Sequence, residues 1–163
     1  MTPKRQRVFG IDPGLARLGW AVIESGGDRL ALVDSGCLIT PAHSPAADRL
    51  LQLQRWLDQL FARFRPGRLA VEKLFFTKNV SSGILIGQAR GVILAAAAKA
   101  KIPIYEFTPT AVKQAVTGYG RADKQQMQQM VKLLLHLPTR PVSDDVADAM
   151  AVAICGIQIH HLV

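Results

Sequence analysis

The stretch Arg7-Val-Phe-Gly-Ile-Asp12-Pro-Gly14, continued by Leu15 to Glu24, decides the fold. The apolar residues before Asp12 are typical of a buried strand, so Asp12 would stand at the edge of the core rather than on a loose loop. A carboxylate beside a core is costly unless it is paired or binds a metal. Asp12 could instead only open the Pro13-Gly14 turn through its side chain, and this stretch by itself leaves both interpretations open.

Two hairpins are predicted around this stretch. A strand from about Arg7 to Asp12 and a second from Gly19 to Glu24 pair around Pro13-Gly14. Gly26-Gly27-Asp28 is another turn signal, and a third strand is expected near Leu30 to Ile39. The first part of the chain is therefore predicted to be an antiparallel meander.

Helices and strands alternate after the meander. Ser44 as cap and Pro45 as first helical residue predict the start of a helix that Pro66-Gly67 ends. The run from Arg68 to Leu74 predicts a fourth strand, buried on both faces. A fifth strand is expected from Ile102 to Phe107, with Pro103 marking its start or an edge.

Three further helices are predicted towards the end of the chain. Thr108-Pro109 repeats the cap-plus-proline signal before a helix over Thr110 to Val116. Apolar residues at helical spacing from Met127 to Leu134 predict a core-facing helix, and Ser143 to about His160 predicts the last one. The expected architecture is a single α/β domain over residues 1–163, with a mixed five-stranded sheet (the antiparallel meander plus two parallel strands) covered by helices.

A stripe of glycines marks the helix predicted from about Gly83 to Lys101. Gly83, Gly87 and Gly91 recur every fourth residue, although a glycine costs about 1 kcal/mol in a helix interior. Such a stripe indicates close approach by another element, either the domain's own sheet or the same helix of a second subunit. Polar residues at 88, 90 and 99 interrupt this apolar stretch and argue against a membrane span.

Composition points to a polyanionic partner. Twenty Lys and Arg against 12 Asp and Glu give a formal net charge of +8, which favours nucleic acid first and a membrane surface second. Cys37 and Cys155 both sit in apolar stretches, as buried reduced thiols do, which indicates a reducing compartment. With no hydrophobic signal core near the start, a cytoplasmic location is expected.

The scarce acids suggest a cation site. Asp12 and Glu72 each come at or near the end of a strand, and the two strands are expected to run parallel, so the side chains can converge. Asp148 shares a helix face with either Asp144 or Asp145, and spacing does not choose between them. Oxygen ligands favour Mg²⁺ or Mn²⁺, used in pairs for phosphodiester cleavage. The alternative is that the acids at 144 and 145 only complement the helix dipole, which accounts poorly for Asp148. No P-loop motif is present, which excludes a P-loop nucleotidase.

Taken in order, the motifs resemble those of the RuvC-type Holliday junction resolvases, within the ribonuclease-H-like superfamily. The resemblance runs over nearly the whole chain, and its specificity comes from the set of motifs rather than from any one. The matching motifs are Gly10-Ile-Asp-Pro-Gly14, Val71-Glu72, Lys78-Asn79, Gly87-Gln-Ala-Arg-Gly91, Val112-Lys-Gln114 and Asp145-Val-Ala-Asp-Ala149.

The resemblance implies a ribonuclease-H-like fold and a metal-dependent endonuclease that acts as a homodimer on four-way DNA junctions, nicking two strands symmetrically during recombination and repair. It also implies Mg²⁺ or Mn²⁺, two ions per active site, and hand-over of the junction from a RuvA/RuvB branch-migration complex. The glycine-striped helix is expected in the dimer interface. The acidic quartet of the family falls on Asp12, Glu72, Asp145 and Asp148, with Asp144 as an extra acid.

The same resemblance implies a set of DNA contacts. Phe75 is expected to stack on a base near the crossover, and Lys113 and Lys124 are expected near the phosphates as catalytic lysines. Lys73, after the glutamate, departs from the family pattern. The remaining expected DNA contacts are Lys78, Asn79 and Arg121. A ribonuclease H that cuts RNA–DNA hybrids and a non-catalytic junction-binding protein are the alternatives.

Overall fold

The computed structural model describes residues 5–27, 29–74, 80–138 and 142–159. Its sheet has five strands in the order β3-β2-β1-β4-β5. The strands are β1 (Gln6–Asp12), β2 (Arg17–Gly26), β3 (Arg29–Ile39), β4 (Arg68–Glu72) and β5 (Ile104–Phe107). The helices are α1 (Ala46–Phe64), α2 (Val80–Lys99), α3 (Pro109–Thr117), α4 (Lys124–Leu134) and α5 (Asp144–Gln158).

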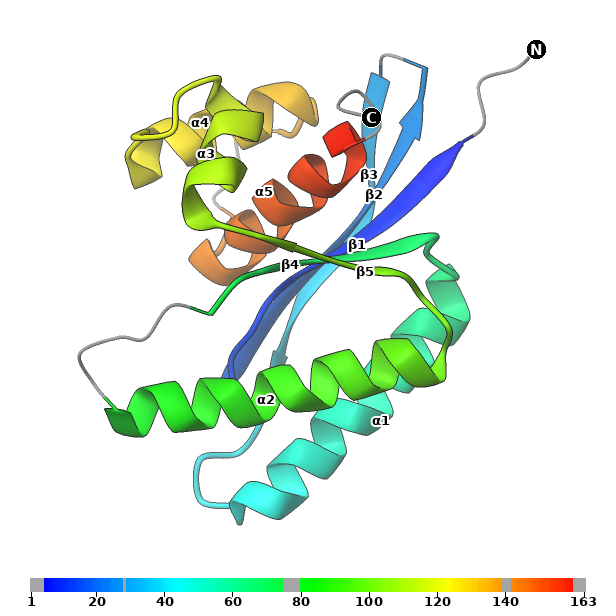
Figure 1. Cartoon of the computed structure of the whole chain (residues 1–163), viewed down its shortest axis with the longest axis vertical. Helices are drawn as coiled ribbons and strands as arrows, with labels where there is room; N and C mark the ends of the chain where they lie inside the picture. The colour runs from blue at the N-terminus through cyan, green and yellow to red at the C-terminus, as the bar shows by residue number, and fades with distance from the viewer. Residues whose placement is uncertain (1–4, 28, 75–79, 139–141, 160–163) are drawn as a thin grey trace.

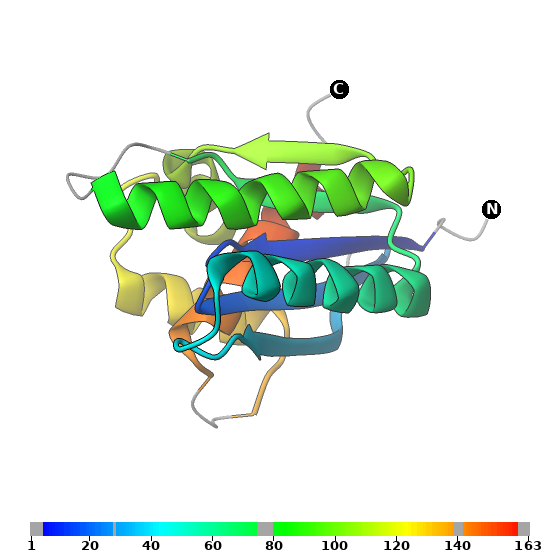
Figure 2. The same ribbon diagram turned by 90° about the horizontal axis from the view of Figure 1, so that it is seen from below.

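The sheet is mixed, as predicted. Strands β1, β2 and β3 pair antiparallel, whereas β4 runs parallel to β1 and β5 runs parallel to β4. Helices α1 and α2 cover one face of the sheet, and α5 with α3 and α4 covers the other (Figures 1 and 2). The predicted three-strand meander plus two parallel strands is therefore confirmed.

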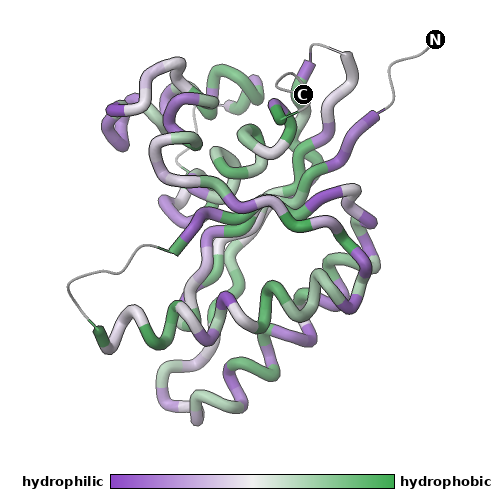
Figure 3. Tube along the Cα trace, in the orientation of Figure 1, coloured by the Kyte–Doolittle hydropathy of each residue, from purple (hydrophilic) through white to green (hydrophobic). Residues whose placement is uncertain are grey.

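Two hydrophobic cores form, one on each face. Residues of β1 alternate between them: Phe9 and Ile11 pack towards α1 and α2, and Val8 packs towards α5. Figure 3 shows the apolar segments gathering where the helices meet the sheet and continuing to the outer end of α2. Strand β4 is buried along most of its length, as expected for a strand covered on both faces.

Two glycines let α5 lie directly against the strands. A Cβ atom at Gly10 would overlap the carbonyl oxygen of Ala149, and one at Gly19 would overlap the carbonyl oxygen of Asp145. Only a residue without a side chain fits such close approach. Because Gly19 pairs with Asp12 across the hairpin, this contact brings the start of α5 to the end of β1.

Several predicted boundaries were wrong by a few residues. Pro45 rather than the predicted Ser44 is the N-cap of α1, with an extended ψ of 144° and no side-chain capping hydrogen bond. Strand β4 ends at Glu72 rather than Leu74, and β5 starts at Ile104, just after Pro103. In contrast, the Thr108 cap is confirmed by its side chain accepting from the Ala111 N–H.

Candidate active site

Two acids stand side by side at the carboxyl end of the sheet. Ile11 of β1 is in register with Val71 of the parallel strand β4, so the next residues, Asp12 and Glu72, end neighbouring strands. Both are partly buried. This is the convergence that the sequence predicted, and it is the usual position of a site in an open α/β sheet.

Helix α5 adds acids to the same place. Burial, and then the negative charges of Asp148, Asp145 and Glu72, raise the pKa of Asp12 from its ordinary 3.8 to about 7. Burial and the nearby Asp148 also raise the pKa of Glu72. The charges of all four predicted acids therefore act together at Asp12, and their repulsion, added to burial, disfavours the ionised form of Asp12.

A hollow of about 210 Å³ opens beside the acids. Glu72 and Asp148 contribute to its wall together with Lys113 and Lys124. Lys113 acts to lower the pKa of Glu72, while Lys124 acts in the same direction on Asp12 and Asp148. The two lysines predicted to contact phosphate thus face the acids across one open space. The other residues lining the hollow are Pro109, Val112, Met127 and Ala151.

Asp145 forms an ion pair with an arginine. Its Oδ2 accepts a hydrogen bond from Nε of Arg17 at 2.7 Å, and Sγ of Cys37 lies 3.9 Å from the same oxygen. In the described part of the chain, no three Asp, Glu, His or Cys side chains are close enough to hold a metal ion as they stand. The oxygen-only donor set and the raised pKa values nevertheless fit a hard divalent cation, which would relieve the repulsion among the acids.

Asp144 contacts a lysine rather than the acid cluster. It accepts from Nζ of Lys124 at 2.7 Å and from Nε2 of Gln128 at 2.8 Å. These hydrogen bonds, the one from Lys124 first, lower the pKa of Asp144. Asp144 therefore anchors the start of α4 to the start of α5, beyond the helix-dipole role considered from sequence.

Two arginines at the site escaped the sequence reasoning. Arg90 on α2 donates from Nη1 to the carbonyl oxygen of Glu72 at 2.9 Å, and its Nη2 lies 2.8 Å from Oε2 of Glu106 on β5. It thereby fixes the ends of β4 and β5 next to the acids. Arg17 lies two residues before Gly19, and alternate residues of a strand lie on the same face of the sheet. Since Gly19 contacts α5 at Asp145, this spacing could have placed Arg17 near that acid.

The predicted DNA contacts are only partly visible. Phe75, Lys78 and Asn79 lie outside the described residues. Arg121 is exposed in the connection between α3 and α4. Its position is consistent with an outward-facing contact, and its role remains a prediction.

The glycine stripe of α2 turns away from the domain. An added Cβ at Gly87 or Gly91 would meet no atom within 4 Å, so packing of these two positions against the chain's own sheet is wrong. Gly83, one turn earlier, is partly buried. Among the described residues, α2 is long and apolar enough to cross a membrane by length and composition alone. Its buried side, including Ile93, belongs to the core shared with α1 and the sheet.

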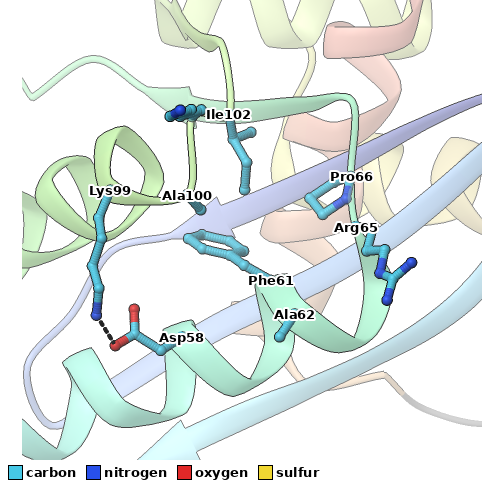
Figure 4. A pocket seen from close by; sticks show the side chains of 9 residues that line it. Asp58, Phe61, Ala62, Arg65, Pro66, Lys99, Ala100 and Ile102 are labelled. Carbon is cyan, nitrogen blue, oxygen red and sulfur yellow. Dashed lines mark hydrogen bonds and ion pairs between the residues drawn. The ribbon is translucent and has the colours of Figure 1, made fainter.

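A larger hollow lies elsewhere, at the C-terminal ends of α1 and α2. It measures about 450 Å³, and Asp58 and Lys99 pair across it at 2.8 Å (Figure 4). Phe61 and Ile102 contribute apolar surface to its wall. None of the predicted site residues lines this hollow, so it is separate from the acid cluster.

Comparison with known proteins identifies the family. The family model described as "Crossover junction endodeoxyribonuclease RuvC" matches residues 8–156. A protein of that name from Chloroflexus aggregans is 58% identical over 149 residues, 91% of each chain, and one from Desulfitobacterium hafniense is 53% identical over 148 residues, 91% of this chain and 90% of the relative. Thermus thermophilus RuvC, 33% identical with 96% of both chains covered, superposes with a TM-score of 0.88, and of 0.91 in its complex with a Holliday junction substrate. The predicted ribonuclease-H-like fold is thereby confirmed, and the chain belongs to the RuvC family of crossover junction endodeoxyribonucleases.

Proposed function

We propose that this chain resolves four-way DNA junctions by metal-dependent, symmetric nicking of two strands, as a single nuclease domain. One observation carries the proposal: two acids and two lysines, Glu72, Asp148, Lys113 and Lys124, line one open hollow beside Asp12. Carboxylates that hold cations, next to ammonium groups that hold phosphate, are the parts needed for phosphodiester hydrolysis. The relatives' printed name, and the Thermus protein's complex with a Holliday junction substrate, support the choice of substrate.

The metal is proposed to be Mg²⁺ or Mn²⁺, two ions per site, held by Asp12, Glu72, Asp145 and Asp148. When bound, such ions supply an activated water and stabilise the charge on the leaving oxygen of an in-line displacement. The strand ends hold Asp12 and Glu72 on rigid scaffold, and Arg90 fixes the backbone of Glu72. The acids therefore need little rearrangement at β1 and β4, whereas Asp145 must leave its arginine for both of its oxygens to be available.

The lysines are proposed to orient the scissile phosphate. Lys113 lies next to Glu72, and Lys124 is anchored by Asp144 at 2.7 Å, so their ammonium groups would offset the negative charge that develops on the phosphate. Arg121 would add a contact to the DNA backbone outside the hollow. Phe75, Lys78 and Asn79 are proposed to contact DNA near the crossover.

A homodimer is proposed through α2. Val80 is 72% exposed and Ile84 58%, and an added Cβ at Gly87 or Gly91 would meet no atom. An exposed apolar face with a small-residue stripe suits close packing against a second copy of itself. Two sites held at a fixed separation would then select a branched substrate by its shape. A cytoplasmic location and hand-over from a branch-migration complex are proposed with this function.

The test is incubation with an immobile synthetic four-way junction, with and without Mn²⁺, followed by mapping of the nicks. We expect symmetric nicks on two strands of like polarity, only with the ion. Asp145→Asn should still shift the junction in a gel while failing to cut it. Preferred cutting of an RNA–DNA hybrid would favour a ribonuclease H. Binding of the junction without nicks under any metal condition would favour a non-catalytic binding protein.

A further inference from the structure

The contact between Arg17 and Asp145 places a positive charge inside the proposed metal site. The Arg17 Nε lies 2.7 Å from Oδ2 of Asp145. About half of the Arg17 side chain is exposed, and 30% of the Asp145 side chain. The guanidinium group therefore has room to leave, unlike a group locked in the core.

The fold explains why these two residues meet. Arg17 and Gly19 share a face of β2, and α5 lies against Gly19 at the backbone of Asp145. Cys37 of β3 pairs with Gly19, and its Sγ is 3.9 Å from the same oxygen. Oδ2 of Asp145 thus contacts one side chain from each of the two neighbouring strands, Arg17 of β2 and Cys37 of β3.

We propose that Arg17 is a positioning residue that serves as the resident counter-ion of Asp145 and must be displaced from Oδ2 when a divalent cation binds there. The inference rests on the proposed function, which makes Asp145 a metal ligand. It accounts for two observations together. Asp145 pairs with Arg17 at the position where we propose a metal ion, and no three acids of the described residues are close enough to hold such an ion. Arg17 thereby stabilises the metal-free protein and weakens the binding of the ion at Asp145.

The test measures Mn²⁺ binding by calorimetry in the absence of DNA. Arg17→Met removes the charge and keeps the length of the side chain, so the dissociation constant of the Asp145-dependent ion should fall about fivefold, the size expected for an exposed ion pair. The matched control is Arg55→Met, which makes the same charge change at an exposed position of α1 on the other face of the sheet. Its affinity for Mn²⁺ should match that of the unmodified protein. Should Arg17→Met fold poorly, Arg17→Gln makes the same test.

A double substitution separates local competition from a general electrostatic effect. In an Asp145→Asn background, Arg17→Met should change Mn²⁺ affinity no more than Arg55→Met does. Unchanged or weaker Mn²⁺ binding by Arg17→Met, or an effect that persists in the Asp145→Asn background, would overturn the inference. If Asp145→Asn alone leaves Mn²⁺ binding unaffected, the metal site of the proposed function fails instead, so the two failures are distinguishable.

Discussion

Helices α5 and α2 are both rich in apolar residues and both lie on the sheet, yet they differ in what they leave exposed. Helix α5 buries 11 of its 15 residues, and its exposed residues include Asp144 and Asp148. Helix α2 buries four of its 20 residues, and it exposes apolar side chains such as Ile84. The apolar character of α5 is accounted for by its own domain, whereas that of α2 is not.

The difference shows which helix packs fully against its own domain. Gly10 and Gly19 allow α5 to lie in close contact with the strands, which positions its acids at the ends of β1 and β4. A Cβ atom added at Gly87 or Gly91 of α2 would meet no such contact. We infer that α5 supplies residues of the active site and that α2 supplies an interface for a second subunit. The following predictions test these two roles in turn.

The largest effect is expected for Asp148→Asn, near the start of α5, where we propose a catalytic acid. Losing one proposed carboxylate ligand should remove several kcal/mol of transition-state stabilisation, so junction cleavage should fall about 100-fold or more while gel-shift affinity is retained. The control is Asp58→Asn, which removes an acid that pairs with Lys99 away from the cluster. Cleavage that survives Asp148→Asn at the rate of the control would take α5 out of the chemistry.

The next effect concerns the outer face of α2. Ile84→Glu places a charge in the proposed interface and should weaken dimerisation about 100-fold, because a charge without a partner is costly to bury. Sedimentation over a range of protein concentrations measures the change. Paired cleavage of both strands should become uncoupled as the monomer accumulates.

Leu133→Glu is the matched control for this substitution. Leu133 lies on α4 and is 65% exposed, close to the 58% of Ile84, so the two changes are alike in chemistry and exposure. The control should sediment as the unmodified protein does. Equal behaviour of the two variants would show that α2 is no more an interface than any exposed apolar position.

A pH dependence of stability is expected from Asp12. Its pKa is raised from 3.8 to about 7, so between these values the native state binds more protons than the unfolded state. The free energy of unfolding of the metal-free protein should therefore fall as pH rises from about 4 to 8, by on the order of 4 kcal/mol, and level off above about 8. Glu72 and Asp148, whose pKa values are also raised, add to this slope.

Urea denaturation in the presence of a chelator, from pH 5 to 8, measures this slope. Asp12→Asn should remove its largest part, and Mn²⁺ should oppose it because the ion binds the ionised acids. The pKa of Asp144 is lowered from 3.8, so Asp144 affects the free energy of unfolding only at pH values below this window. A flat profile between pH 5 and 7 would contradict the crowding of acids at Asp12.

The sheet and the acids at the strand ends, Asp12 and Glu72, were predictable because their signals are local, whereas the choice of Asp145 over Asp144 came from the family resemblance. A strand that ends in Asp12, followed by a Pro-Gly turn, predicts a hairpin wherever it occurs. The pair of Arg17 with Asp145 was not predictable in this way, because it joins residues 128 positions apart and depends on how α5 lies on β2. The glycine spacing of α2 predicted a helix face that another element can approach closely. Whether that face points to the sheet or to solvent depends on how the helix packs, which the spacing does not determine. At α1 the helix begins one residue later than the proline signal predicts, because Pro45 has an extended ψ of 144° and so precedes the first helical residue.

The smallest effect is expected for Asp144→Asn, at the start of α5. The exposed contact with Lys124 orients the lysine towards the hollow, and an exposed ion pair contributes little, so the cleavage rate should fall about threefold with junction affinity unchanged. Asp144→Glu should restore most of the rate if orientation is the cause. Asp123→Asn is the control, because Asp123 caps α4 through the Gln126 N–H and does not contact Lys124 through any described hydrogen bond. A rate for Asp144→Asn equal to that of this control would show that Lys124 needs no anchor, and that α5 serves the site only through Asp145 and Asp148.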